Sequence, residues 1–401
     1  MRSPVAVALC LIAASASAQD EGTTTDMASL LRRLEAAEAR IKALEEQVQA
    51  APPPVAVAPA RPEDQRPPGA VDLPPERPIT HQLVSLTFNG LVQAWYAAGN
   101  EGFRDTFRIR RTELYFNGQI TNKARWQVMI DPSKVLAFET PATDPRVVVP
   151  PAIAQSTRLL QNAVITFDYN PRLRWSIGQF KLPLGLEGQQ SSGRLDSVER
   201  ALFASDRSRG GAYADVRDIG LMVRAGSGSR LDVQAGVFNG VAESQNETDR
   251  DDQKALAGSI VIRPVSGLHL GSSGAWGNGG GTRPQRDRLG AEVQYTRGPL
   301  TVRSELMTGR DGALHRRGAY GHVGYRFSPR VEGVLRLDAW DPDIHSDADA
   351  STAGERDYIA GVNVFLSQHN LKLQANYVRK TFHDAVVPAR NLFLVSTQTF
   401  W

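Results

Sequence analysis

Arginine supplies most of the side chains through which this chain could do chemistry. Of its 46 basic residues only 7 are lysines, and a guanidinium can hold an oxyanion by two parallel hydrogen bonds. A solvated surface charge, a bracing ion pair and the arginine enrichment of a GC-rich genome are the alternatives for any single arginine. Four arginines share the polar phase of alternating segments: Arg111, Arg125, Arg174 and Arg224. Five more cations lie in one polar stretch, residues 181–216: Lys181, Arg194, Arg200, Arg207 and Arg209.

Enzymatic chemistry has little support in the sequence. The seven histidines are scattered, with no H-E-x-x-H motif and no paired metal-ligand spacing. The glycines at 277–281 belong to a loop between alternating segments and do not open a helix, as those of a phosphate-binding loop would. Four aspartates within residues 341–349 could surround a calcium ion, but their loop lacks the Gly and Glu of an EF-hand. We therefore expect no enzyme, no cofactor and no metal ion.

Residues 1–18 predict a secretory signal peptide. Arg2 provides the positive start, residues 5–14 are apolar, and Ala16-Ser17-Ala18 is a typical cleavage site. The one cysteine, Cys10, lies inside the apolar stretch. The mature chain then has no cysteine, which suits an exported protein without thiol chemistry.

Two further regions precede the alternating part of the chain. Residues 19–50 contain a heptad pattern of apolar residues, from Met27 to Val48, with charged residues between them. This pattern predicts a short coiled coil, and an isolated amphipathic helix is the alternative. Residues 51–80 are rich in Pro and Ala and predict an extended linker that cannot pack a core.

The region 81–401 alternates between apolar and polar residues, which predicts strands with one apolar and one polar face. Sixteen segments of about the length of a tilted membrane strand are separated alternately by short turns and long polar loops. This pattern is typical of an antiparallel outer-membrane β-barrel, whereas a soluble β-sandwich requires neither an even strand number nor one-sided loop lengths. The segments are 84–98, 103–119, 123–131, 162–170, 172–180, 217–226, 229–239, 254–264, 267–276, 287–297, 299–309, 317–328, 330–340, 356–367, 370–380 and 390–401.

Aromatic residues support a membrane barrel. They recur near the ends of the predicted strands, for example at Trp95, Tyr169 and Trp340, where the interfacial girdles of such barrels lie. The last segment ends in Phe400-Trp401, and a terminal aromatic resembles the signal read by the outer-membrane assembly machinery. We therefore place the chain in the outer membrane of a Gram-negative bacterium, with its N-terminal segment in the periplasm.

Several motifs resemble the phosphate-selective porin family over roughly residues 84–401. The most specific is Gly178-Gln179-Phe180-Lys181-Leu182-Pro183-Leu184-Gly185, and weaker ones are Phe107-Arg108-Ile109-Arg110-Arg111, Arg217-Asp218-Ile219-Gly220 and Gly236-Val237-Phe238-Asn239-Gly240. The resemblance implies a homotrimer of sixteen-stranded barrels whose third extracellular loop folds into the pore, where arginines and lysines guide anions. By strand order, residues 181–216 are that loop.

The expected function is passive diffusion of small anions, with phosphate and polyphosphate among the candidates. In the resembled family, phosphate selectivity is attributed to central lysines as well as arginines. Here Lys181 is the only lysine in the region of the expected constriction, so the sequence supports anion passage better than phosphate specificity. Expected partners are phosphate-like anions, outer-membrane lipid and two further copies of the chain, but no nucleic acid. The alternatives are a non-selective diffusion barrel, or an adhesin or structural barrel that anchors the envelope through the coiled coil.

Deletion of residues 27–78 should leave the channel conductance unchanged, because a Pro/Ala-rich linker cannot pack into a barrel. Single-channel recording in planar bilayers, with the full-length protein alongside, measures this directly. Complete loss of conductance in correctly inserted protein would show that the N-terminal arm enters the pore.

Overall fold

The computed structural model describes most of the alternating region. The described residues are 85–401 except 101–102, 104, 135–158, 227, 229, 242–252, 278–284 and 384–386, together with Ala39, which is helical. The predicted signal peptide, coiled coil and linker lie outside them, apart from Ala39. Residues Ile79–Trp401 form a compact unit of their own.

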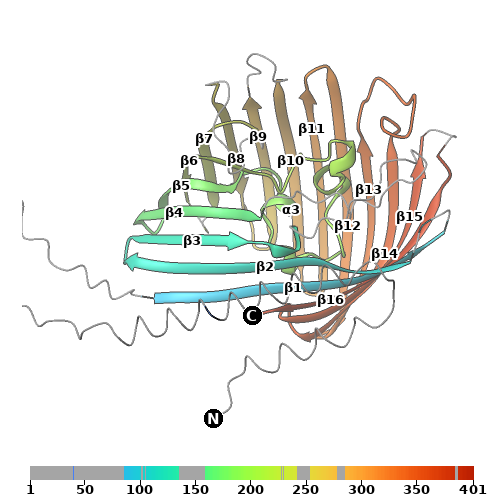
Figure 1. Cartoon of the computed structure of the whole chain (residues 1–401), viewed down its shortest axis with the longest axis horizontal. Coiled ribbons are helices and arrows are strands. Elements are labelled where there is room, and N and C mark those ends of the chain that lie inside the picture. Colours follow the sequence, from blue (N-terminus) through green and yellow to red (C-terminus); the bar gives the residue numbers. More distant parts are fainter. Residues whose placement is uncertain are drawn as a thin grey trace, which may run out of the picture. The chain divides into compact units, whose positions relative to one another are not determined.

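This unit is a closed barrel of sixteen antiparallel strands, as the sequence predicts (Figure 1). Each strand pairs with its neighbours in sequence, and β1 also pairs with β16. The strands are β1 (Ser85–Gly99), β2 (Thr106–Thr121), β3 (Ala124–Ile130), β4 (Leu160–Asn170), β5 (Leu173–Lys181), β6 (Arg217–Ala225), β7 (Leu231–Phe238), β8 (Ala255–Ile262), β9 (Leu268–Gly277), β10 (Arg286–Arg297), β11 (Leu300–Asp311), β12 (Leu314–Ser328), β13 (Val331–Asp341), β14 (Glu355–Ser367), β15 (Leu371–Phe382) and β16 (Arg390–Phe400).

The barrel is apolar outside and polar inside. On β15, Leu371, Leu373 and Tyr377 are exposed, whereas the alternating Lys372 and Gln374 are buried in the interior. A period of two in the sequence produces this arrangement, because successive side chains of a strand point to opposite faces. An apolar outer surface suits contact with lipid. Among the described residues, no helix is long and apolar enough to cross a membrane.

The predicted segments match the sixteen strands to within three residues at every boundary. The clearest difference lies between β11 and β12, which are longer than predicted at their adjoining ends. Only Gly312 and Ala313 separate them, in a tight turn. Gly312 adopts a φ of 63° there, a conformation that favours glycine. A second irregularity is a β-bulge in β2, where Gln93 pairs with Arg111 but Ala94 pairs with Ile109, so that Arg110 is the extra residue.

The segment between β5 and β6, residues 182–216, lies inside the barrel (Figure 1) and is called the inward loop below. Its backbone amides reach distant wall strands: Gly185 donates to Ser273 Oγ on β9 at 3.0 Å, and Val198 donates to Asn376 Oδ1 on β15 at 2.7 Å. Short helical turns shape it, namely α3 (Leu186–Gln189), η2 (Ser192–Arg194), α4 (Leu202–Ser205) and η3 (Arg207–Arg209). A further turn, η1 (Pro132–Lys134), follows β3.

Apolar side chains seat the inward loop against β11–β13. Phe203 of α4 stacks on Tyr320 with ring centroids 6.2 Å apart, and Tyr213 meets Trp340 edge-on at 5.2 Å. All four side chains are at most 2% exposed, so this contact forms one of three buried hydrophobic clusters in the described part of the unit. The second half of the loop therefore packs against β11–β13. Trp95 and Trp340 belong to such clusters, so the expectation that they lie in the interfacial girdles is wrong.

The protein should migrate as a heat-modifiable species in SDS gels of outer-membrane fractions. A closed ladder leaves no strand edge unpaired, so unboiled protein should stay folded in detergent and run faster than the boiled chain. Recovery as a soluble periplasmic protein with a single migration position would contradict the membrane-barrel interpretation.

Candidate functional site

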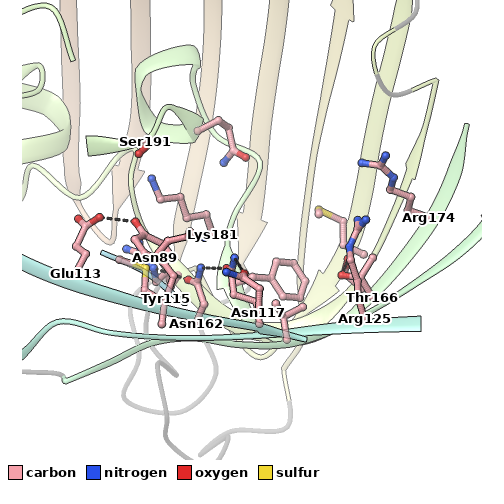
Figure 2. A pocket seen from close by; sticks show the side chains of 18 of the residues that line it. Asn89, Glu113, Tyr115, Asn117, Arg125, Asn162, Thr166, Arg174, Lys181 and Ser191 are labelled. Carbon is pink, nitrogen blue, oxygen red and sulfur yellow. Dashed lines mark hydrogen bonds between the residues drawn. The ribbon is translucent and has the colours of Figure 1, made fainter. Parts of the chain in front are cut away.

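A cavity of about 650 Å³ remains between the inward loop and the wall of β1–β7. Figure 2 shows Arg125, Thr166 and Arg174 at one end of it, and Lys181 with Ser191 of the inward loop at the other. A second void of about 410 Å³ shares Arg125 and Thr166 with the first and extends to Thr121 at the β2–β3 turn. The lining of the two voids together extends from the inward loop to the β2–β3 turn.

Cations dominate the lining of the larger cavity. Among the described residues that line it, Glu113 is the one carboxylate, against five basic side chains: Arg125, Arg174, Lys181, Arg217 and Arg224. The most accessible are Arg125, Arg174 and Arg224, which are 45%, 32% and 35% exposed. These three come from β3, β5 and β6, where alternation turns them towards the interior.

Two aspartates hold these wall arginines in place. Asp168 on β4 bridges two of them, since Arg125 Nη1 lies 2.9 Å from its Oδ2 and Arg174 Nε lies 2.9 Å from its Oδ1. Asp232 on β7 receives Arg224 Nη2 at 2.6 Å, and Arg263 lies 3.9 Å from the same oxygen. The three wall arginines Arg125, Arg174 and Arg224 thus share two carboxylates, Asp168 and Asp232, and this group keeps a net positive charge.

Lys181, the last residue of β5, lines the cavity beside the inward loop. Its Nζ lies 2.6 Å from Asp215 Oδ1 and donates to the carbonyl oxygens of Gly188 and Gln190 at 2.8 and 3.2 Å. Burial alone would raise the pKa of Asp215, but Arg200, Lys181 and Arg217 outweigh it and hold that pKa well below its usual range. Lys181 therefore both lines the cavity and ties the loop together.

Arg111 braces the loop and does not line the cavity. It donates to Gln93 Oε1 at 2.7 Å and to Glu199 Oε1 at 2.8 Å, and its side chain is only 5% exposed. Because of the bulge, Arg110 faces the same carboxylate, with Nη2 at 2.6 Å from Glu199 Oε2. Burial would raise the pKa of Glu199, but the two guanidiniums hold it at about 2. The stabilisation by this carboxylate is present above its ordinary pKa and is lost only as the pH falls towards 2.

A second anchor joins Glu187 of α3 to β13. Arg336 Nη1 lies 2.7 Å from Glu187 Oε1, and the backbone amide of Ala201 donates to Glu187 Oε2 at 2.6 Å. Glu305 on β11 accepts the amides of Leu186 and Glu187 at 2.8 and 2.7 Å. Fully paired buried groups of this kind fix one conformation of the loop.

The remaining loop cations have different positions. Arg200 is 2% exposed and pairs with Asp215 at 3.2 Å, and Arg209 is clamped between Asp206, at 2.7 Å, and Glu355. Neither lines the cavity. Arg194 is exposed, and the side chain of Arg207 lies outside what the structure describes.

Several residues of the cavity were not identified from the sequence. Asp168 could have been found, because the turn after Asn170 places it directly opposite Arg174 in the hairpin. Arg217 lies out of phase with Arg224, but it pairs with Lys181 between β5 and β6, and both residues line the cavity.

In the part of the chain that the structure describes, no three His, Cys, Asp or Glu side chains are placed to hold a metal ion. In the 341–349 loop, whose aspartates could surround a calcium ion, the Asp349 carboxylate instead accepts a hydrogen bond from the backbone amide of Ser351 at 2.7 Å.

Comparison with known families and structures places this geometry in context. The family model of phosphate-selective porins O and P matches residues 92–282, from within β1 to just beyond β9, and confirms the predicted resemblance. A search of curated protein sequences finds no significant match.

Solved outer-membrane porins share the fold. The anion-selective porin from Comamonas acidovorans is 10% identical with a TM-score of 0.53, over 79% of this chain and 99% of that one. OmpF of Salmonella typhi is 11% identical with a TM-score of 0.56, over 79% and 97%. The trimer form of OmpT from Vibrio cholerae is 11% identical with a TM-score of 0.52, over 79% and 99%. At such identities the likeness concerns the barrel fold alone.

Replacing Glu199 by Gln should loosen the inward loop. Removal of one partner of a buried ion pair costs about 3–5 kcal/mol, because the other charges remain buried without compensation. We expect larger open-channel current noise in planar bilayers and faster tryptic cleavage within the loop. Asp168→Asn is the control, since it removes a wall carboxylate that does not contact the loop. Equal noise in Glu199→Gln and the unmodified protein would show that other contacts suffice to hold the loop.

Proposed function

We propose that this protein is a pore for the passive diffusion of small anions across the outer membrane of a Gram-negative bacterium. The observation that carries the proposal is the lining of the cavity, with five basic side chains and one carboxylate. The porin fold and the match to the phosphate-selective family support it.

The position of these charges favours an effect on permeating ions. Fixed charges in a narrow pore with walls of low dielectric constant concentrate oppositely charged solutes. A unit charge about 4 Å from an ion contributes ~1 kcal/mol even at the dielectric constant of water, or about a fivefold change in occupancy. We propose Arg125, Arg174 and Arg224 as the main determinants, with Lys181 at the loop side of the pathway.

Arginine at three of these positions is compatible with phosphate among the solutes. A guanidinium matches two oxygens of a phosphate at once, whereas it meets chloride as a simple charge. Arg111, Arg200 and Arg209 would act indirectly in this proposal, because they hold the inward loop that narrows the pore.

The proposed assembly is a homotrimer surrounded by lipid, with the N-terminal segment in the periplasm. The trimer form of OmpT, which has the same fold, supports a trimer. Ser85 pairs with Gln119, close to the β2–β3 turn, so the chain enters the barrel at its short-turn end. Short turns lie on the periplasmic side in barrels of this kind.

The triple variant Arg125→Gln, Arg174→Gln, Arg224→Gln should lower the chloride-over-potassium permeability ratio at least about fivefold in dilute salt, because one nearby charge alone has an effect of that size. Reversal potentials across bilayers with unequal KCl measure this ratio. The effect should shrink at 1 M salt, where the Debye length is about 3 Å.

Arg379→Gln is the matched control, because Arg379 is exposed on β15, away from the cavity lining. An unchanged ratio in the triple variant, with the barrel folded, would remove the wall arginines from the proposal. A ratio near one in the unmodified protein would favour a non-selective diffusion pore instead.

A further inference from the structure

The cavity has an apolar side that an inorganic anion would not use. Val164, Phe180 and Met222 line it together with the arginines, and we call these three residues the apolar shelf. In a porin, interior-facing positions are expected to be polar, so three neighbouring apolar residues on the pore wall are unusual.

The apolar shelf is firmly supported from behind. Phe180 is 7% exposed and meets Phe238 edge-on, with ring centroids 5.6 Å apart. Val164 and Met222 are only partly buried and pack against the same cluster, which also includes Leu182 and Leu184 of the inward loop. The shelf therefore rests on a packed apolar cluster, and Val164 and Met222 remain partly accessible.

Strand register places the shelf directly beside the arginines. Arg174 pairs with Arg224, and the next interior-facing row contains Ser176 paired with Met222. One row further, Val164 pairs with Gly178, and Gly178 pairs with Gly220. Successive rows are about 7 Å apart, because each is two residues along a strand.

The two glycines leave the space beside Val164 free of side chains. Gly178 has a φ of 124°, a conformation that other residues rarely adopt. At Gly220 a Cβ atom would lie 2.6 Å from the ring of Phe238 and 2.3 Å from a backbone oxygen. Neither position can readily carry a side chain that would cover the shelf.

The arginines retain hydrogen-bonding capacity for a ligand. Within the described part of the chain, Arg174 contacts Asp168 through Nε and Arg125 contacts it through Nη1. Both arginines line the cavity and are partly exposed, at 45% for Arg125 and 32% for Arg174. Cationic donors thus lie at one end of the site, and an apolar surface begins about 7 Å away.

We propose that this site selects organic anions with an apolar body, such as aromatic or branched aliphatic carboxylates. The carboxylate would meet Arg125, Arg174 and Arg224, and the apolar body would cover Val164 and Met222. This inference rests on the proposed anion pore and adds a preference within it. Burial of one face of a phenyl ring against the shelf should raise occupancy about tenfold over an anion without that body.

The test uses the full-length protein in planar bilayers at pH 7.4, with sodium benzoate, sodium acetate and inorganic phosphate as probes. The concentration dependence of chloride-current block gives a binding constant for each. We expect benzoate to bind about tenfold more tightly than acetate. In the double variant Val164→Thr, Met222→Gln, the benzoate constant should weaken at least about fivefold, whereas the acetate and phosphate constants and the KCl reversal potential stay unchanged.

Val261→Thr is the matched control, because Val261 is buried on β8 and does not line the cavity. It should leave the benzoate preference intact. Equal block by benzoate and acetate in an anion-preferring channel would overturn this inference but leave the proposed function standing. A benzoate preference that survives in the double variant would also overturn it. A channel without anion preference in the KCl measurement would overturn the proposed function itself.

Discussion

The hydrogen-bonded pairing of β1 with β16 is the constraint on which the rest of the molecule depends. Nine residue pairs join the two strands, and Gly90 and Trp401 exchange backbone hydrogen bonds at 3.0 Å in both directions. Lipid offers no partner to a backbone group, so a membrane sheet must close on itself. Closure then turns every second side chain inward, and the interior becomes polar. Whatever fills such an interior must bring polar partners of its own.

The inward loop meets this demand with charge. Its carboxylates at Glu187 and Glu199 each pair with buried wall arginines. Its backbone amides donate hydrogen bonds to side-chain oxygens of the wall, such as those of Glu305 and Asn376. Removing charges from water is costly, and only such complete pairing offsets that cost. One residue type therefore occurs in two environments in this barrel. A buried, paired arginine such as Arg111 holds the loop, whereas Arg125 is 45% exposed and lines the cavity.

The sequence predicts the barrel well because local alternation encodes strands. The strand number, the boundaries and the inward phase of Arg125, Arg174 and Arg224 follow from a period of two and from the turn residues. The sequence does not predict which of these cations hold the inward loop and which line the cavity. Arg111 meets Glu199, 88 residues away, and Arg336 meets Glu187, 149 residues away. These contacts depend on how the inward loop packs, and residue spacing in the sequence does not predict that packing. Nor does the alternation of apolar and polar residues predict the bulge that turns Arg110 inward.

The partial neutralisation of the wall arginines suits a pore better than a tight binding site. Conduction requires that a solute be attracted strongly enough to enter and weakly enough to leave. Asp168 takes part of the charge of Arg125 and Arg174, and Asp232 does the same for Arg224. Three unopposed arginines side by side would hold a multivalent anion too tightly for it to leave. In the proposed site, the two carboxylates would leave a positive but moderate field, in which weak apolar contacts at Val164 and Met222 would be large enough to discriminate among anions. The proposed selectivity for an apolar body would therefore require the aspartates as much as the arginines.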